Sequence, residues 1–452
     1  MSGFKPTPHP NPAMKVIGKI VYGGGARGRG GAHLAPKRQP RPTALVLILG
    51  VLLVAGAISS AFGAKSPNGP SAVTVGSTQF QRVAQQASKA RLANELDRAI
   101  ALYRQALKLN PRWDEGWWYL GTLYYDTNQY ALGVDALRNL VELDPNYGPG
   151  WALLGLCEFE THDYKNSVFH LRTAVAKGLG GNIELANAVN YHRALIENMR
   201  GDFEGAQAIL NSLVANGVLS EVVRFALGMA LLRIPLLPNQ VNPTTDAVIH
   251  QAGGVGELVA LADYDQAENA FEKLVKNYPK TPFVHYAYGS MLANLARYHD
   301  AQAQFQDEIE VNPESAIAYM ELALVDLHLN QDKDALPLSE KAAQLAPDSF
   351  VAHYLLGRAL LAAGQVQQAV KQLETARQLG PFSPEVRYSL AQALARDHRP
   401  NAAARQRAAF VRLNAALQRV RRLQGSAGQS YRMSNSRGEL APHEGESPGQ
   451  SQ

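Results

Sequence analysis

Apolar and polar residues follow one another along most of the chain with the spacing of amphipathic helices, and recurring small residues divide these helices into pairs. Two helices of a hairpin can approach closely only where the side chains between them are small. The small residues expected at the first crossing are Ala87, Gly121, Gly155, Ala194, Gly228, Gly289, Ala323, Gly357 and Ala391. Those expected at the second crossing are Ala99, Gly133, Ser167, Ala206, Ala267, Ala301, Ala335, Ala369 and Ala403.

Prolines give the period of this pattern. Successive prolines recur at one constant interval in two series, Pro111 and Pro145, and then Pro279, Pro313, Pro347 and Pro381. Each follows a helical stretch and ends it, because proline cannot continue a helix. The interval is about 34 residues and contains helix, turn and helix, which is typical of one repeat family.

The residues between the prolines resemble the tetratricopeptide repeat. Trp117, Leu120, Gly121 and Tyr124 stand in the order of the family motif, and Trp151, Leu154 and Gly155 repeat it, with Glu158 in place of the tyrosine. Leu356-Gly357 repeats it again near the C-terminal end. The resemblance implies an all-α fold, a right-handed α–α superhelix of about nine tetratricopeptide-like hairpins over residues 79–422.

One region departs from the period. A helix is expected over residues 221–233, and three prolines then occur within nine residues, which excludes helix interior there. A further helical stretch, 247–262, precedes the helix expected at 264–277, which is one helix too many for a hairpin. We therefore expect an insertion at about 234–262 in the fifth hairpin, which would divide the array into two lobes.

The N-terminal segment predicts a membrane element. Residues 43–64 contain no charge, and their length in a helix, about 33 Å, would cross a hydrocarbon core of about 30 Å. The basic, Gly/Pro-rich leader 1–42 carries eight Lys and Arg and no acid, which predicts that it stays in the cytoplasm and that the repeats lie outside. The alternative is a signal peptide that is cleaved near Ala61-Phe62-Gly63, and the true start could be Met1 or Met14.

Charge and motifs limit the function. Removing the leader's eight from 44 basic residues leaves 36 against 39 acids, so the body lacks the basic face of a nucleic-acid-binding protein. No catalytic motif and no room for a catalytic domain occur, so we expect no enzyme, cofactor, metal site or small-molecule substrate. The single thiol, Cys157, is expected to be buried and inert, and His285 and His353 to fill core positions that tryptophan normally holds.

Family resemblance also implies a peptide-binding groove lined by the first helices. The fifth residue of each hairpin should point into it, and most of these residues are aromatic. The groove residues expected are Trp118, Tyr125, Tyr191, Phe225, Tyr286, Met320, Tyr354, Arg358 and Tyr388. Family members that clamp an acidic C-terminus use Lys and Asn there, so this pattern favours a segment with apolar anchors.

The function expected is a non-catalytic scaffold or assembly factor that binds protein segments. It would be tethered to the inner membrane by a single span at 43–64, with a linker at 65–78, the repeats outside the cytoplasm and a polar tail at 423–452 expected to be disordered. A secreted or periplasmic adaptor and a regulatory subunit of an enzyme complex are the alternatives. The basic helix at 400–422 is expected to close the array with a polar outer face.

Overall fold

The computed structural model describes residues 75–425, and this part of the chain consists of helices and turns. It contains 19 α-helices and two short 3₁₀ turns, Pro238–Gln240 and Pro243–Thr245. The helices are α3 (Val75–Leu92), α4 (Leu96–Leu109), α5 (Asp114–Asp126), α6 (Tyr130–Leu143), α7 (Gly148–Glu160), α8 (Tyr164–Lys177), α9 (Ile183–Met199), α10 (Phe203–Ala215), α11 (Glu221–Leu231), α12 (Asp246–Ala260), α13 (Tyr264–Asn277), α14 (Val284–Asn294), α15 (Tyr298–Val311), α16 (Ala316–His328), α17 (Asp332–Leu345), α18 (Phe350–Ala362), α19 (Val366–Leu379), α20 (Pro384–Arg396) and α21 (Pro400–Gly425).

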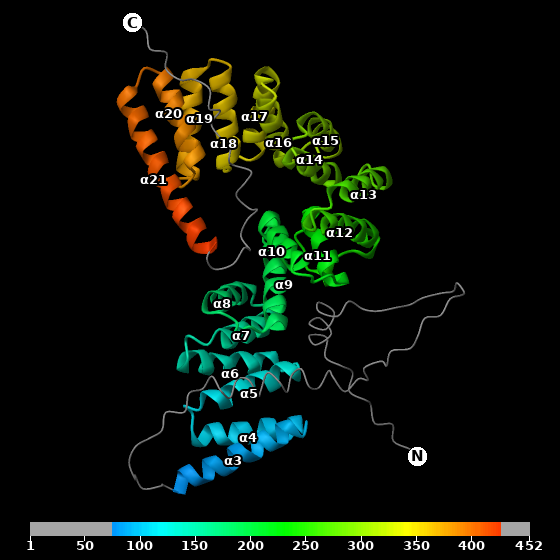
Figure 1. Cartoon of the computed structure of the whole chain (residues 1–452), viewed down its shortest axis with the longest axis vertical. Coiled ribbons are helices and arrows are strands. Elements are labelled where there is room, and N and C mark those ends of the chain that lie inside the picture. The colour runs from blue at the N-terminus through cyan, green and yellow to red at the C-terminus, as the bar shows by residue number, and fades with distance from the viewer. Residues whose placement is uncertain (1–74, 426–452) are drawn as a thin grey trace, which may run out of the picture.

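Most helices pack as antiparallel pairs, and the pairs stack into one curved array (Figure 1). Eight hairpins are regular, and α11, α12 and α13 form a three-helix unit between the fourth and fifth of them. The expectation of an all-α array of helical hairpins is confirmed for the described residues. The leader 1–42, the expected span 43–64 and most of the linker and tail lie outside these residues. Within the described part, none of the helices combines the length and the apolar run that a bilayer crossing requires.

The small residues lie where the paired helices touch. Every one of the eighteen crossing residues expected from the sequence is buried. A Cβ atom added to Gly121 would come within 2.6 Å of the Leu137 side chain on the partner helix, and one added to Gly357 within 2.5 Å of Leu373. Leu137 and Leu373 are fully buried, so they have no free space to move into. In the regular hairpins, each glycine at the first crossing therefore makes room for a large residue of the second helix.

The turn inside each hairpin passes through one residue in the left-handed backbone conformation. Asparagine and glycine take several of these positions, since they adopt this conformation at the lowest cost. The residues are Asn94, Asn128, His162, Gly201, Ala262, Ala296, Asn330, Gly364 and His398, and most follow one another at the repeat period. The turn thus fixes the reversal of the chain after every first helix.

A second bond fixes the turn between hairpins. The carbonyl oxygen of five of the six turn prolines, all but Pro313, accepts a hydrogen bond from the side chain six residues later, on the next first helix. Trp117 Nε1 donates to Pro111 O at 2.8 Å, and Trp151 Nε1 donates to Pro145 O at 2.9 Å. His285 and His353 make the same bond through Nε2 to Pro279 and Pro347, as Arg387 does to Pro381. The two histidines therefore do hold the position of tryptophan, and the bond needs a nitrogen donor rather than an indole ring.

The three-helix unit differs from the insertion expected at 234–262. The helix α12 falls inside that range, and it packs between α11 and α13 instead of leaving the array. Its backbone meets that of α11 closely, because a Cβ at Gly228 would lie 2.0 Å from Ile249 O and one at Gly253 would lie 2.1 Å from Arg224 O. The sequence pattern did not identify Gly253 as a crossing residue, so α12 was not recognised as the partner of α11.

The core runs without interruption through this unit. The buried cluster that contains α12 and α13 also includes Met229 of α11 and Leu322 of α16. A neighbouring cluster joins α9 and α10 to Leu227 of α11. Since α11 contributes to both clusters, packing continues through this helix from the first half of the array into the second.

Two glycine-to-alanine variants test whether a small residue is required at the first crossing. Gly121→Ala should lower the free energy of unfolding by about 1–3 kcal/mol, because the new methyl group overpacks against Leu137. Gly254→Ala on α12 is the matched control, since a Cβ there meets no atom within 4 Å. This control should be neutral or stabilise the protein by up to about 1 kcal/mol, as helical alanine does relative to glycine. Chemical denaturation of both variants measures the difference, and equal effects would contradict the packing argument.

Candidate functional site

The inner face of the curved array is formed by the first helices of the hairpins. Neighbouring first helices contact one another, α5 with α7, α7 with α9, α14 with α16, α16 with α18 and α18 with α20. Within residues 75–425 the second helices of the same hairpins, such as α15 with α17 or α17 with α19, make no comparable contact. Helices on the inner side of a curved stack lie closer together, so this face is the concave one. It is the surface on which a bound segment could contact several hairpins at once.

Five of the nine expected groove residues lie on first helices and are half-buried. Trp118 packs edge-on against Tyr147, and Phe225 packs similarly against His250 of α12. Tyr388 lies against Phe410 of α21, with ring centroids 5.5 Å apart. The five residues are Trp118, Phe225, Met320, Arg358 and Tyr388. Each keeps part of its side chain accessible, so these residues can contact a ligand without rearrangement.

The other four expected residues, Tyr125, Tyr191, Tyr286 and Tyr354, are buried. Tyr286 lies under the guanidinium of Arg233, and Tyr354 bonds to Arg358 and Ser389. Their rings therefore belong to the hydrophobic core of the array. Whether any of the nine contacts a partner stays a prediction.

The ring of Tyr286 is covered by the side chain of Arg233, which lies in the turn directly after α11. Arg233 lies with its guanidinium 4.6 Å from the ring centroid of Phe203, 5.5 Å from that of Tyr286 and 5.9 Å from that of Phe283. It also pairs with Glu204 of α10. These contacts join α10, the turn after α11 and the start of α14, so they hold the three-helix unit against its neighbours on both sides.

The first half of the array carries two carboxyl groups at the ends of first helices that the sequence analysis did not select. Asp126 and Glu160 end the first helices α5 and α7, next to Tyr125 and Tyr130. Burial raises the pKa of Asp126 to about 6, and it raises the pKa of Glu160 while the nearby His162 opposes that shift. The signal available in the sequence was their place directly after an aromatic residue near the end of a first helix, Tyr125 or Phe159.

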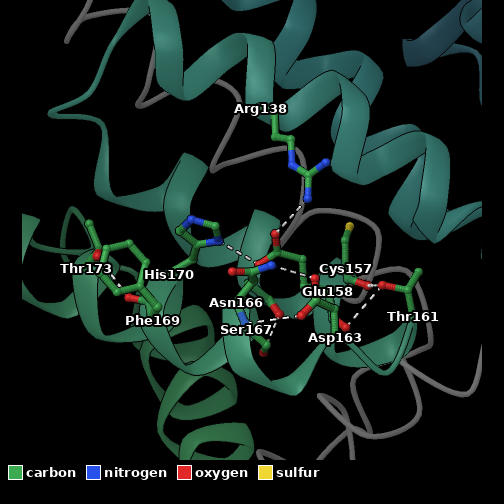
Figure 2. Close-up of polar contacts among 11 residues, drawn as sticks. Arg138, Cys157, Glu158, Thr161, Asp163, Asn166, Ser167, Phe169, His170 and Thr173 are labelled. Atoms are coloured by element: carbon green, nitrogen blue, oxygen red, sulfur yellow. Dashed lines mark hydrogen bonds and ion pairs between the residues drawn. The ribbon is translucent and has the colours of Figure 1, made fainter.

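Three buried acids replace the tyrosine of the repeat motif. Glu158 on α7 accepts from Arg138 of α6 at 3.5 Å and pairs with His170 of α8 at 2.6 Å (Figure 2). Glu197 stands at the same place on α9 and pairs with Arg172, which follows Arg138 by one repeat period. The same ion pair thus crosses two successive interfaces between hairpins. A buried carboxylate requires such partners, so these acids serve the stacking of the array.

Asp326 on α16 is the third of these acids, and within residues 75–425 it forms no ion pair with a cation. It is 2% exposed and accepts from Gln302 Nε2 at 2.8 Å. Burial raises the pKa of Asp326 to about 6, while the bond from Gln302 opposes the shift and Asp334 adds to it. Its charged form therefore weakens the fold near neutral pH.

The remaining reactive groups are enclosed. Cys157 is buried, as expected, and burial raises the pKa of its thiol well above the usual range. His192 is also buried, and burial lowers its pKa to about 4 although the bond to Ala188 O opposes the shift. Within the described residues no group of three or more metal-binding side chains occurs.

Comparison with known proteins agrees with this geometry. Models of the tetratricopeptide repeat match residues 85–148, 258–281, 289–350 and 331–393. The matched ranges cover less than half of the chain, and within them the chain is similar to the tetratricopeptide repeat family. Arrays of this family are scaffolds for protein–protein interaction, and this coarse function holds for the tetratricopeptide array described above.

No curated protein matches this chain. Among solved structures, MamA from Desulfovibrio magneticus RS-1 is 23% identical, with 38% of this chain and 97% of MamA covered and a TM-score of 0.35. YrrB, described as a TPR protein with an unusual peptide-binding site, is 18% identical over 38% of this chain and 88% of its own, with a TM-score of 0.34. Yeast Tom70 is 14% identical over 76% of this chain and 96% of its own, with a TM-score of 0.28.

A pH titration tests the burial of Asp326. A carboxyl with a raised pKa holds its proton more tightly in the folded state, so folding is favoured as pH falls from about 6 towards its ordinary value near 4 and disfavoured as pH rises through that window. Asp326→Asn removes this ionisation. The melting midpoint of the variant, relative to the original protein, should therefore be higher at pH 7 than at pH 4. A difference that does not change with pH would contradict the shift.

Proposed function

We propose that the inner face binds an extended or helical segment of a partner protein through apolar anchors, without catalysis. The observation that supports this most directly is the row of half-buried Trp118, Phe225, Met320 and Tyr388 on the first helices. Aromatic side chains contribute much of the binding energy at protein interfaces, because they bury a large area and lose little rotamer freedom.

The charges of this face limit the kind of segment. Arg358 on α18 lies over the ring of Tyr354, at 5.8 Å from its centroid, and has no ion pair among the described residues. Arg358 is the one cation among the nine expected groove residues, and a single cation cannot clamp an acidic tail, which would need several donors. The preferred segment is therefore largely apolar, and its affinity should depend only modestly on salt.

The proposal includes a tether. The uncharged segment 43–64 and the basic leader before it support a single span with the array outside the cytoplasm, and the linker to α3 begins at Lys65. The span would hold the inner face close to one membrane, where the partner would be met. Cleavage near Ala61-Phe62-Gly63 would instead release a periplasmic or secreted adaptor.

Topology can be measured directly. Protease added to spheroplasts should digest the array while the leader 1–42 stays protected, because the positive charges are retained on the cytoplasmic side. The N-terminal sequence of the membrane-bound protein then separates an uncleaved anchor from a cleaved signal. An array that resists protease while a known external protein is cut would show that the orientation is wrong.

Binding can be assigned to the inner face with two double variants. Once a partner has been captured, Met320→Ala with Tyr388→Ala should lower its affinity at least about tenfold, or about 1.4 kcal/mol, because two anchors are lost. The control is Phe169→Ala with Phe382→Ala, which removes two rings that are 63% and 79% exposed on α8 and in the turn before α20. Circular dichroism checks that both variants fold. Equal losses in the two variants would count against the inner face as the binding site.

A further inference from the structure

The last helix, α21, is unlike the second helix of any other hairpin. It has 26 residues, whereas its partner α20 has 13 and the preceding second helix α19 has 14. At about 1.5 Å per residue it is about 39 Å long, so roughly half of it extends beyond α20. Figure 1 shows α21 continuing past the ends of α18, α19 and α20. Closing the core of the array requires only the first half.

The sequence of α21 carries charge of one sign. It contains six arginines and no acid. The array before it, residues 75–399, has 27 Lys and Arg against 36 Asp and Glu. Contact between two copies of α21 would bring like charges together, which disfavours self-association through this helix. Its charge instead matches an anionic partner.

The arginines form a row on the solvent side. Arg405, Arg412 and Arg419 are exposed and follow one another at intervals of seven residues. Seven residues make two turns of helix with a drift of about 20°, so the three side chains share one face at a spacing of about 10.5 Å. None of the three forms an ion pair among the described residues, unlike Arg138, Arg224 or Arg297 elsewhere in the array.

The residues between the arginines are small. Ala404, Ala408 and Ala415 are exposed on this face, while Ala403 and Phe410 face α20. Small side chains let the helix lie close to a flat surface, and the arginines can extend past them to anionic groups. A straight row of charges on a long helix fits an extended planar surface better than a compact acidic pocket.

The curvature of the array also fits an extended planar surface as the partner. In Figure 1, α3 and α21 lie at the two ends of the curve on one side, and α11 to α13 lie on the other. The linker of ten residues at 65–74 reaches about 34 Å at most, so a span at 43–64 would keep α3 near the membrane. One membrane surface could then contact both ends.

We propose that the exposed face of α21 docks on an anionic lipid surface, so that the array is held to the membrane at its second end as well as through residues 43–64. This inference rests on the proposed tether for its geometry, but the charge row of α21 carries it separately. Each arginine near an anionic surface contributes about 1 kcal/mol, so loss of three should weaken the contact about 100-fold.

The test uses the full chain with a fluorophore on Ala408→Cys, since the native Cys157 is buried and does not compete for the label. The protein is placed in vesicles of phosphatidylcholine alone or of equal parts phosphatidylcholine and phosphatidylglycerol, and quenching by nitroxide-labelled lipid is measured. Arg405→Gln/Arg412→Gln/Arg419→Gln is compared with Lys273→Gln/Lys276→Gln/Lys280→Gln, which removes the same charge from an exposed part of α13 and the turn after it.

Quenching is expected only in the anionic vesicles, with the contact weakened about 100-fold in the arginine variant and unchanged in the lysine variant. No difference between neutral and anionic vesicles, or equal loss in both variants, overturns the proposal. A label that responds to polyglutamate or duplex DNA but not to anionic lipid overturns it in favour of another anionic partner. Flotation with neutral vesicles in high salt tests the span separately, so failure of the tether is distinguishable from failure of the α21 contact.

Discussion

The close approach of paired helices is the interaction on which the rest of the structure depends. In the regular hairpins with a glycine at the first crossing, a large buried side chain of the second helix fills the space, as Leu137 does above Gly121. This packing sets the distance and angle of the two helices, and the repetition of one hairpin geometry produces a curve rather than an irregular cluster. The inner face, with its half-buried rings, forms only because this geometry brings each first helix into contact with the next one.

The turns convert this local packing into a stack. A left-handed residue reverses the chain within a hairpin, and a proline carbonyl bonded to the next first helix fixes the step between hairpins. Tryptophan, histidine and arginine all supply the donor for that bond, although their shapes differ widely. The geometry of the step therefore depends on a nitrogen–hydrogen group at a fixed distance along the helix, and the ring that carries it can vary.

Most of the fold could be predicted from the sequence because it depends on residues at fixed intervals. The crossing residues and the turn prolines recur once in every repeat, so their spacing alone located the regular hairpins. The unit α11–α13 could not be predicted in this way, because Gly228 meets Gly253 across a loop of irregular length. The burial of Tyr191 and Tyr354 could not be predicted from the sequence either, because it depends on how far the neighbouring hairpin covers each ring. The acid pairs of Glu158 and Glu197 were missed, although the interval between Arg138 and Arg172 could have indicated them.

The three-helix unit has a consequence for how the chain can change in length. On either side of it, most interfaces between hairpins share the proline bond of the turn, so duplication of one such hairpin would add a copy whose turn resembles those of its neighbours. The contacts around α12 occur once, and Arg233 fits between α10 and α14 only. Growth or loss of repeats can therefore proceed within each flank but not across this unit. The three-helix unit therefore stays constant while the number of hairpins on either side of it can change.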